Sequence, residues 1–175
     1  MCENELQIDL ITHKCLKSRI RNEYKELSKK YENIKILWDD ETKNVLIEIQ
    51  DIIKDDEKDI FKFIVVEDYP FHSPNFYYNN KPYSHYLGIP SQRFSELLKK
   101  FVNKTCLCCS SLACKYNWSP GVKLKMFIDE LNKLRQYKRN IVHKILADKV
   151  KDKYLIDDVD LDSFLFSTFS TFGKG

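Results

Sequence analysis

The chain has 175 residues, of which 43% are hydrophobic, so it is long and apolar enough to build a core of its own. Its 29 lysines and arginines nearly balance 26 aspartates and glutamates, and a net charge of +3 is too small to indicate a nucleic-acid-binding protein by itself. No apolar run reaches the roughly 18 residues that a membrane span needs. The first ten residues, MCENELQIDL, are acidic where a secretory signal is basic, so we expect a cytoplasmic or nuclear protein with reduced cysteines.

An amphipathic helix is predicted over residues 13–31. Its apolar side chains recur at intervals of three or four: Leu16, Ile20, Tyr24, Leu27 and Tyr31. Lysines and arginines fill the positions between them and give the helix a basic outer face. That face is either a solvated surface or a surface for a partner.

Three strands are predicted next, because apolar residues alternate with polar ones in three successive runs. The side chains on the apolar side of the runs are Ile34, Ile36 and Trp38, then Val45, Ile47 and Ile49, then Phe61, Phe63 and Val65. The joints between the runs are short and polar, which is typical of an antiparallel meander. A fourth strand is predicted at NFYYNN, residues 75–80, after the proline-bracketed segment YPFHSP.

Helices are predicted to follow the strands. Pro90 and Ser91 begin one over residues 91–103. Ser119 is the expected N-cap, and Pro120 the expected first residue, of a long helix that continues through Leu134.

The chain is predicted to end with a further helix over residues 138–155 and an acidic, phenylalanine-rich tail over residues 157–175. We expect one core domain over residues 1–156. Strands in one run with helices before and after them indicate an α+β fold.

The segment TCLCCSSLACKYNWSPG places four of the six cysteines within nine positions. A metal site, a disulfide and one working thiol are the alternatives. A reducing compartment disfavours the disulfide. Cys-x-Cys-Cys-x4-Cys also lacks the two separated pairs of structural zinc sites, so we expect no metal and no cofactor.

In this order, the parts resemble the ubiquitin-conjugating enzyme family. The resemblance is carried by YPFHSP at residues 69–74, by Cys106-Leu107 and by Trp118-Ser119-Pro120, and it covers roughly residues 13–135. It implies an N-terminal helix, a four-stranded antiparallel meander, a cysteine-bearing loop, and then crossover and C-terminal helices.

The resemblance also implies that Cys106 holds the carboxyl terminus of ubiquitin, or of a similar modifier, as a thioester. Cys109 and Cys108 are the alternative positions for this role. The family's His-Pro-Asn motif, whose asparagine supports the oxyanion, has no counterpart in this sequence. His85 and Asn103 are the candidates for a substitute donor.

The partners implied by the resemblance are the modifier, an activating enzyme and a ubiquitin ligase, with neither nucleic acid nor membrane among them. The activating enzyme would contact the basic residues of the first helix, Lys14, Lys17, Arg19 and Arg21. The ligase would contact an apolar patch made of Phe71, Ser119 and Pro120. A catalytically inactive binding module of the same fold is the alternative, followed by a small zinc-binding domain.

Overall fold

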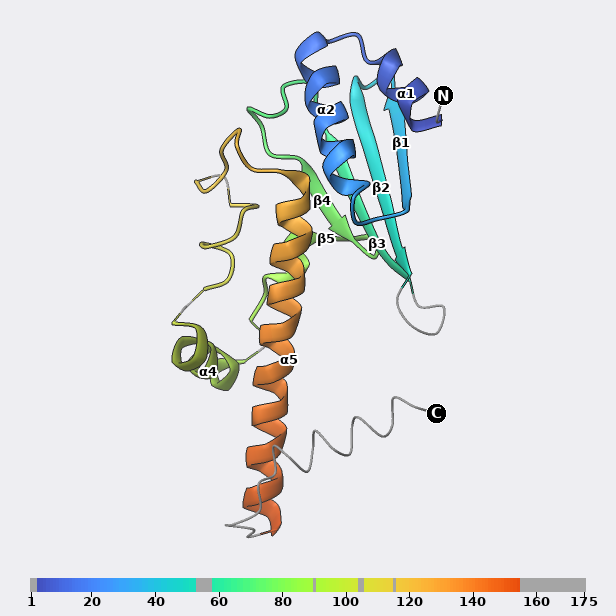
Figure 1. Cartoon of the computed structure of the whole chain (residues 1–175). Helices are drawn as coiled ribbons and strands as arrows, with labels where there is room; N and C mark the ends of the chain where they lie inside the picture. The colour runs from blue at the N-terminus through green and yellow to red at the C-terminus, as the bar shows by residue number, and fades with distance from the viewer. Residues whose placement is uncertain (1–2, 53–57, 90, 104–105, 115, 155–175) are drawn as a thin grey trace. The chain divides into compact units, whose positions relative to one another are not determined.

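The computed structural model describes residues 3–52, 58–89, 91–103, 106–114 and 116–154 (Figure 1). Its elements are, in chain order, α1 (Glu3–Leu10), α2 (Lys14–Leu27), β1 (Asn33–Asp39), β2 (Asn44–Ile52), β3 (Lys58–Val65), β4 (Asn75–Tyr78), β5 (Lys81–Pro82), α3 (Tyr83–Tyr86), α4 (Gln92–Val102) and α5 (Leu124–Tyr154). The chain divides into two compact units, residues 1–88 with 106–132 and residues 89–105 with 133–175.

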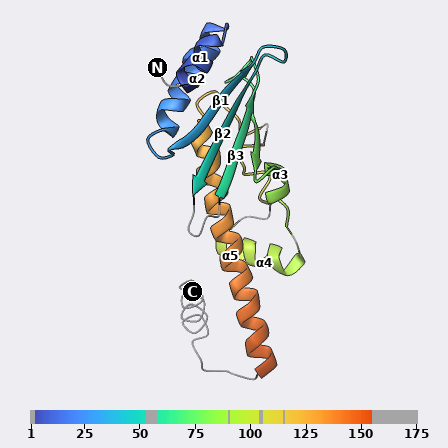
Figure 2. The same ribbon diagram turned by 90° about the vertical axis from the view of Figure 1, so that its right-hand side faces the viewer.

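The strands of the first unit form one antiparallel sheet in the order β1-β2-β3-β4-β5, which confirms the predicted meander (Figure 1). Figure 2 shows β1, β2 and β3 side by side. The predicted apolar sides of β2 and β3 are buried throughout, whereas on β1 only Ile36 is buried. The register aligns Ile36 with Ile47, Ile47 with Phe63, and Phe63 with Phe76. This row of buried apolar side chains crosses four strands and lines the sheet side of the core.

The sheet has a fifth strand that the sequence pattern did not predict. Asn79 and Asn80 have positive φ angles of 45° and 61°, and they connect β4 to the two-residue β5 as a tight hairpin. Asparagine tolerates this backbone region better than most residues, which explains its use at both turn positions. Asn79 also accepts a hydrogen bond from the Ile60 amide at 2.8 Å, which ties the hairpin to β3.

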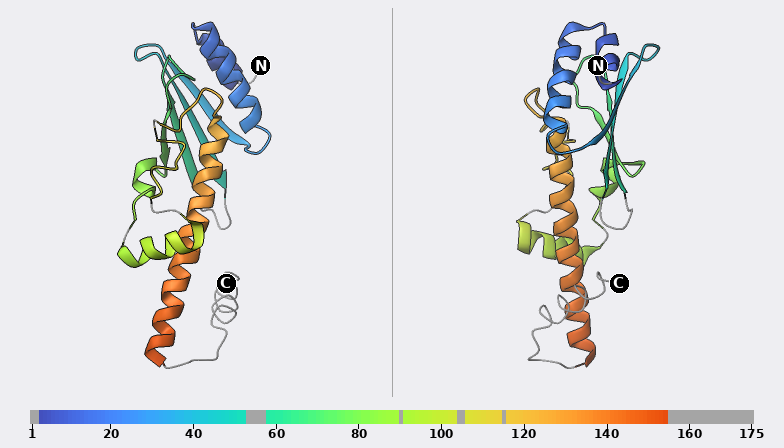
Figure 3. Two further views of the ribbon diagram at one scale, coloured as in Figure 1. Left: turned by 90° about the vertical axis from the view of Figure 1, so that its left-hand side faces the viewer. Right: turned by 45° about the vertical axis from the view of Figure 1, so that its right-hand side comes forward.

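One face of the sheet is covered by α2 and by the beginning of α5 (Figure 3). The predicted amphipathic helix is confirmed with narrower bounds, and α2 buries Leu16, Ile20 and Leu27. From α5, the Phe127 ring stands edge-on to Phe63 and Phe76, with centroid distances of 6.1 and 5.7 Å. These aromatic contacts join the last helix of this unit to the middle of the sheet.

Helix α1, which the sequence pattern did not predict, covers the free edge of β1. The Asn4 side chain donates to the Ile34 carbonyl at 2.8 Å and accepts from the Ile36 amide at 2.9 Å. Gln7, one helical turn later, accepts from the Trp38 amide at 3.2 Å. Side-chain amides thus satisfy backbone groups that an exposed edge strand would offer to another chain.

The prediction for the start of the last helix is wrong. Ser119 is not its N-cap and Pro120 is not its first residue, because α5 begins at Leu124. Residues 119–122 instead form a turn, in which the Val122 amide donates to the Ser119 carbonyl at 3.0 Å. The separate helix predicted over residues 138–155 is also wrong, since α5 runs without interruption to Tyr154. No glycine or proline falls between Leu124 and Tyr154 to end it.

In the second unit, the helix predicted over residues 91–103 is confirmed as α4. The Ser91 side chain caps it by accepting from the Phe94 amide at 3.2 Å, and Asn103 ends it in the left-handed conformation. Within this unit Arg93 pairs with Asp148 of α5 at 3.0 Å.

The predicted tail at residues 157–175 lies outside the described residues. In the described part of the chain, no helix combines the length and apolar character that crossing a membrane requires.

Candidate functional site

The cysteine segment, residues 106–123, lies directly before α5 in the first unit, and its described residues, 106–114 and 116–123, form turns and bends. Leu107, Ser111 and Val122 are buried, and they attach the segment to the core. Cys106 is half-buried beside Leu107, whereas Cys108 and Cys109 are exposed. The Cys-Leu pair thus presents one thiol at the surface while its neighbour is anchored.

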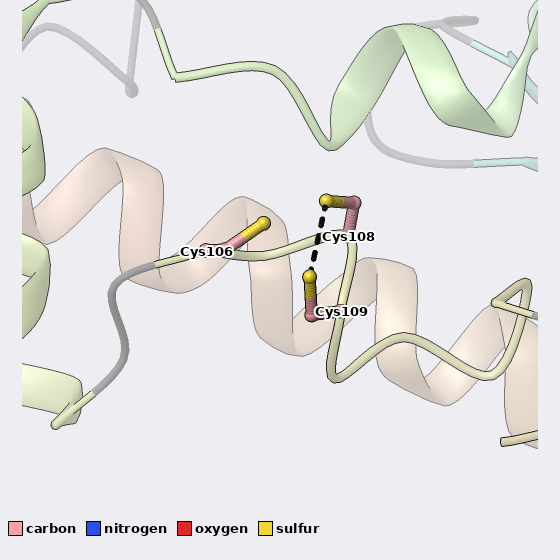
Figure 4. Close-up of side chains that lie close together, drawn as sticks. All are labelled: Cys106, Cys108 and Cys109. Atoms are coloured by element: carbon pink, nitrogen blue, oxygen red, sulfur yellow. Dashed lines mark hydrogen bonds between the residues drawn. The ribbon is translucent and has the colours of Figure 1, made fainter. Parts of the chain in front are cut away.

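Three thiols of this segment lie close together. The sulfur atoms of Cys106, Cys108 and Cys109 are all within 4.8 Å of one another, and Figure 4 shows them turned toward a common space. Cys108 Sγ and Cys109 Sγ are 3.8 Å apart. We call these three residues the thiol cluster. Within the described residues, neither Cys114 nor His85 belongs to this group, so the four-cysteine zinc arrangement with a nearby histidine does not form.

The pKa values of Cys106 and Cys108 are shifted in opposite directions. The pKa of Cys106 is lowered from 9.0 to about 7, first by a hydrogen bond from the Cys108 thiol and then by the backbone amide of Cys109. The pKa of Cys108 is raised to about 11, because its thiol serves as a donor to Cys106 and Cys109. Since the thiolate is the nucleophilic form of cysteine, these shifts favour the thiolate at Cys106 and disfavour it at Cys108.

Two polar side chains hold the segment in place. Asn117 Nδ2 donates to the Cys109 carbonyl at 2.8 Å and to the Ser111 carbonyl at 3.0 Å. Glu130 of α5 accepts from the Leu112 amide at 2.9 Å through one oxygen and from the Tyr83 hydroxyl at 2.8 Å through the other. The loop that carries the thiol cluster is therefore held in place by side-chain hydrogen bonds to its backbone.

Trp118 joins the cysteine segment to the loop that contains YPFHSP. Its Nε1 donates to the Pro70 carbonyl at 2.9 Å, and its ring lies 6.0 Å from Tyr69 and 5.9 Å from Phe127. Two stretches that carry the family resemblance, almost fifty residues apart in sequence, are thus in direct contact. No local pattern in the sequence indicates this contact.

A buried carboxylate that the sequence analysis missed lies at the start of α5. Glu23 of α2 is 2% exposed, and one of its oxygens accepts from the Leu124 amide at 3.0 Å. Its other oxygen pairs with Arg19 at 2.8 Å and accepts from the Tyr69 hydroxyl at 2.9 Å. A carboxylate at a helix N-terminus satisfies a free amide and favours the helix dipole, so Glu23 serves in place of the predicted serine cap.

The predicted activating-enzyme surface is only partly open. Lys14 is exposed, but Arg19 is engaged with Glu23 and with the Val122 carbonyl at 2.8 Å. Lys17 and Arg21 both bind Asp9 of α1. Lys17 donates to the Asp9 backbone carbonyl at 2.7 Å, and Arg21 donates to the Asp9 carboxylate at 2.8 Å. Helix α1 therefore neutralises much of the basic face. Arg19 is the most deeply engaged of the four predicted cations, because it holds both a buried carboxylate and a backbone carbonyl.

The predicted apolar patch is exposed. Phe71 is 75% exposed, and Ser119 and Pro120 are exposed as well. The hydrogen bond between Trp118 and Pro70 links the two loops that carry these residues. A core position for Phe71, the simplest alternative for a phenylalanine, is thereby excluded.

The two candidate oxyanion donors belong to different units. His85 is an exposed residue of α3, and its ring lies 5.4 Å from Tyr86 in an edge-on contact. Asn103 is the left-handed C-cap of α4 and belongs to the second unit.

Comparisons of the chain with protein-family models, curated proteins and solved structures gave no match. Any function must therefore be argued from the geometry of the site.

Proposed function

We propose that this protein is a ubiquitin-conjugating acyltransferase that carries ubiquitin, or a ubiquitin-like modifier, as a thioester on Cys106. The observation that carries the proposal is the half-exposed Cys106 thiol with its pKa lowered to about 7, on a loop fixed by Trp118 against Pro70. The order of helix, antiparallel meander, cysteine segment and helix supports it. Cys106 is preferred to Cys108, whose pKa is raised, and to Cys109, which lacks a buried neighbour of the kind that Leu107 provides.

The chemistry requires only a thiolate. The Cys106 sulfur attacks the carbonyl carbon of the modifier's thioester on the activating enzyme, a new C–S bond forms, and the enzyme's cysteine leaves as a thiolate. In the second step an acceptor thiolate or amine attacks the same carbon, and Cys106 leaves. An amine acceptor loses its proton to solvent or to a base in this step. A thiol with a low pKa is a good leaving group, so the lowered pKa of Cys106 favours transfer onward.

Transfer to lysine is expected to be slow. No His-Pro-Asn motif precedes Cys106, and the side-chain amide of Asn117 already donates to two carbonyl groups of the loop. The loss of one oxyanion donor typically costs on the order of 100-fold in rate. A thiolate is a stronger nucleophile than an amine and depends less on this help. We therefore propose that the natural acceptor is a cysteine of a ligase.

The partners in this proposal are the modifier, an activating enzyme and a ligase, which are found where thiols stay reduced, in the cytoplasm or nucleus. Phe71, Ser119 and Pro120 would contact the ligase, because they are exposed on two joined loops. Among the four predicted cations of α2, Lys14 is exposed and available to the activating enzyme. Lys17 and Arg21 would have to exchange Asp9 for an acidic group of the partner.

The test is the intact mass of the protein after incubation with activating enzyme, ATP and ubiquitin. We expect one added ubiquitin that is removed by a thiol reductant. Cys106→Ser should abolish the adduct or convert it to an ester that resists thiols, whereas Cys114→Ser, a matched control outside the cluster, should leave it unchanged. A reducible adduct that persists in Cys106→Ser and disappears in Cys109→Ser would reject Cys106.

Single-turnover discharge of the loaded protein tests the choice of acceptor. We expect rapid discharge onto a small thiol and slow discharge onto free lysine. Rapid lysine discharge that falls sharply in His85→Ala or Asn103→Ala would reveal a rebuilt oxyanion site. If lysine discharge is rapid and neither variant changes it, the argument from the missing asparagine is wrong.

An inactive binding module is the second candidate. It is favoured by the engagement of the Asn117 amide within the loop, which leaves that amide unavailable to an oxyanion. In this case the protein binds modifier or ligase without forming an adduct. Binding measured by calorimetry, unchanged in Cys106→Ser and lost in Phe71→Ala, would support this alternative.

A further inference from the structure

The spacing of the three sulfur atoms matches what a thiophilic metal ion needs. A metal–sulfur bond of about 2.3 Å places neighbouring thiolates about 3.8 Å apart in a tetrahedral site and about 4.0 Å apart in a trigonal one. Cys108 Sγ and Cys109 Sγ are already 3.8 Å apart, and all three sulfurs lie within 4.8 Å of one another (Figure 4). Each sulfur therefore has to move by about 1 Å or less to reach a common ion.

We propose that Cys106, Cys108 and Cys109 form a three-thiolate site for a soft, closed-shell cation, either Zn²⁺ or Cu⁺. The sequence argued against such a site, because the spacing lacks separated pairs and two of the cysteines are adjacent. The structure removes the second objection, since the turn at 107–109 brings the side chains of adjacent residues to the same side.

The donor set determines the class of ion. Three thiolates are soft ligands, and within the described residues no carboxylate or histidine joins them, so hard cations such as Mg²⁺ or Ca²⁺ do not fit. Cu⁺ is satisfied by three sulfurs alone. Zn²⁺ needs a fourth ligand, which solvent can supply because Cys108 and Cys109 are exposed. On binding, each cysteine that is still protonated releases its proton to solvent, and three S–metal bonds form.

The surrounding loop favours a defined site. Asn117 holds the Cys109 carbonyl, the Ser111 amide donates to the Cys108 carbonyl at 3.2 Å, and the Leu107 side chain is buried. The backbone of the cluster is thus fixed before any ion arrives, which lowers the conformational entropy that binding must overcome. A flexible exposed Cys-rich tail would lack this advantage.

The site also has a consequence for loading, which, unlike the ion site itself, rests on the proposed function. A sulfur that coordinates an ion is not free to attack a carbonyl carbon. Metal and modifier would therefore compete for Cys106, and metal availability would control how much protein can be charged.

The first experiment is metal binding by the reduced full chain in oxygen-free buffer, after a thiol titration has shown all six cysteines free. Zn²⁺ and Cu⁺ are titrated in separate arms against chelators of known affinity, and Co²⁺ serves as a spectroscopic probe for Zn²⁺. We expect one ion per chain, proton release, and a thiolate-to-Co²⁺ charge-transfer band. The arm that competes with the stronger chelator identifies the preferred ion.

Variants locate the ligands. Replacing any one of the three cluster residues by serine should weaken binding by more than the 10- to 100-fold typical of losing an outer-shell partner. Cys15→Ser, an exposed cysteine on α2, is the matched control and should bind as the parent does. Absence of binding by fully reduced parent protein would overturn the proposal, as would binding that Cys15→Ser or Cys114→Ser weakens as much as Cys108→Ser does.

A second measurement separates this proposal from the thioester proposal. One equivalent of the preferred ion should protect Cys106, Cys108 and Cys109 from alkylation, as read by peptide mass mapping, while Cys15 stays reactive. This result needs no modifier or activating enzyme. Protection without loading would keep the ion site and reject the acyltransferase, and loading without protection would do the reverse.

Discussion

The lowered pKa of Cys106 makes a prediction that can be followed at a single residue. Its main cause is the hydrogen bond from the Cys108 thiol, followed by the backbone amide of Cys109. Cys108→Ala removes the first contribution and leaves the second. The pKa of Cys106 in this variant should therefore rise from about 7 toward the ordinary value of 9.0 without reaching it.

The expected rate follows from two opposing effects. At pH 7 a pKa of about 7 gives about one half thiolate, against about one hundredth at the ordinary value of 9.0, a gain of about 50-fold. Intrinsic nucleophilicity falls with pKa by a factor of about 6 to 10 over the same two units. At pH 7, Cys106 should therefore react about 5 to 8 times faster than an ordinary cysteine. Above about pH 8.3 the order should reverse, because both cysteines are then largely or increasingly thiolate and the ordinary one is the stronger nucleophile.

The assay is alkylation by iodoacetamide in the presence of a chelator, with the labelled peptide measured by mass spectrometry across about pH 5 to 10. The rate should rise with pH through a midpoint near 7, because the thiolate is the reacting form, and then level off. The same chain unfolded in denaturant provides the reference. A wild-type midpoint equal to that of the unfolded chain would refute the reasoning, and an unchanged midpoint in Cys108→Ala would reject the thiol hydrogen bond as its cause.

Three further predictions concern the framework of the site. Glu23→Gln keeps the size of the side chain but removes a buried charge that serves an ion pair and a helix N-terminus, so the free energy of unfolding should fall by about 2–3 kcal/mol. Chemical denaturation measures this loss, and a change under about 0.5 kcal/mol would contradict a structural role. Trp118→Phe removes the hydrogen bond to the Pro70 carbonyl, so the free energy of unfolding should fall by about 1 kcal/mol in the same assay. An unchanged free energy of unfolding would show that this hydrogen bond does not form. Asn117→Ala frees two carbonyl groups and should speed proteolysis within residues 106–118 while the far-ultraviolet circular dichroism stays constant, and parent-like proteolysis would show that the amide does not hold the loop.

Local patterns were sufficient for the elements whose partners are close in sequence. The alternation of Val45, Ile47 and Ile49 predicted a strand with one buried side, because side chains in a strand point to opposite faces at every step. Ser91 predicted the start of α4, because an N-cap bonds to an amide three residues away. The Cys106-Leu107 pair was likewise visible in the sequence, whereas the burial of Leu107 came from the structure.

Tertiary structure decided the rest, because the interactions join residues far apart in the chain. Helix α5 begins at Leu124 and not at Pro120, since its first amide is satisfied by Glu23 from α2, 101 residues earlier. Helix α1 has too short an apolar stripe to be recognised, and its position depends on Asn4 bonding to the edge of β1. The meeting of three sulfurs depends on the path of a turn whose anchors, among them Glu130 of α5, become neighbours only when the helix packs on the sheet.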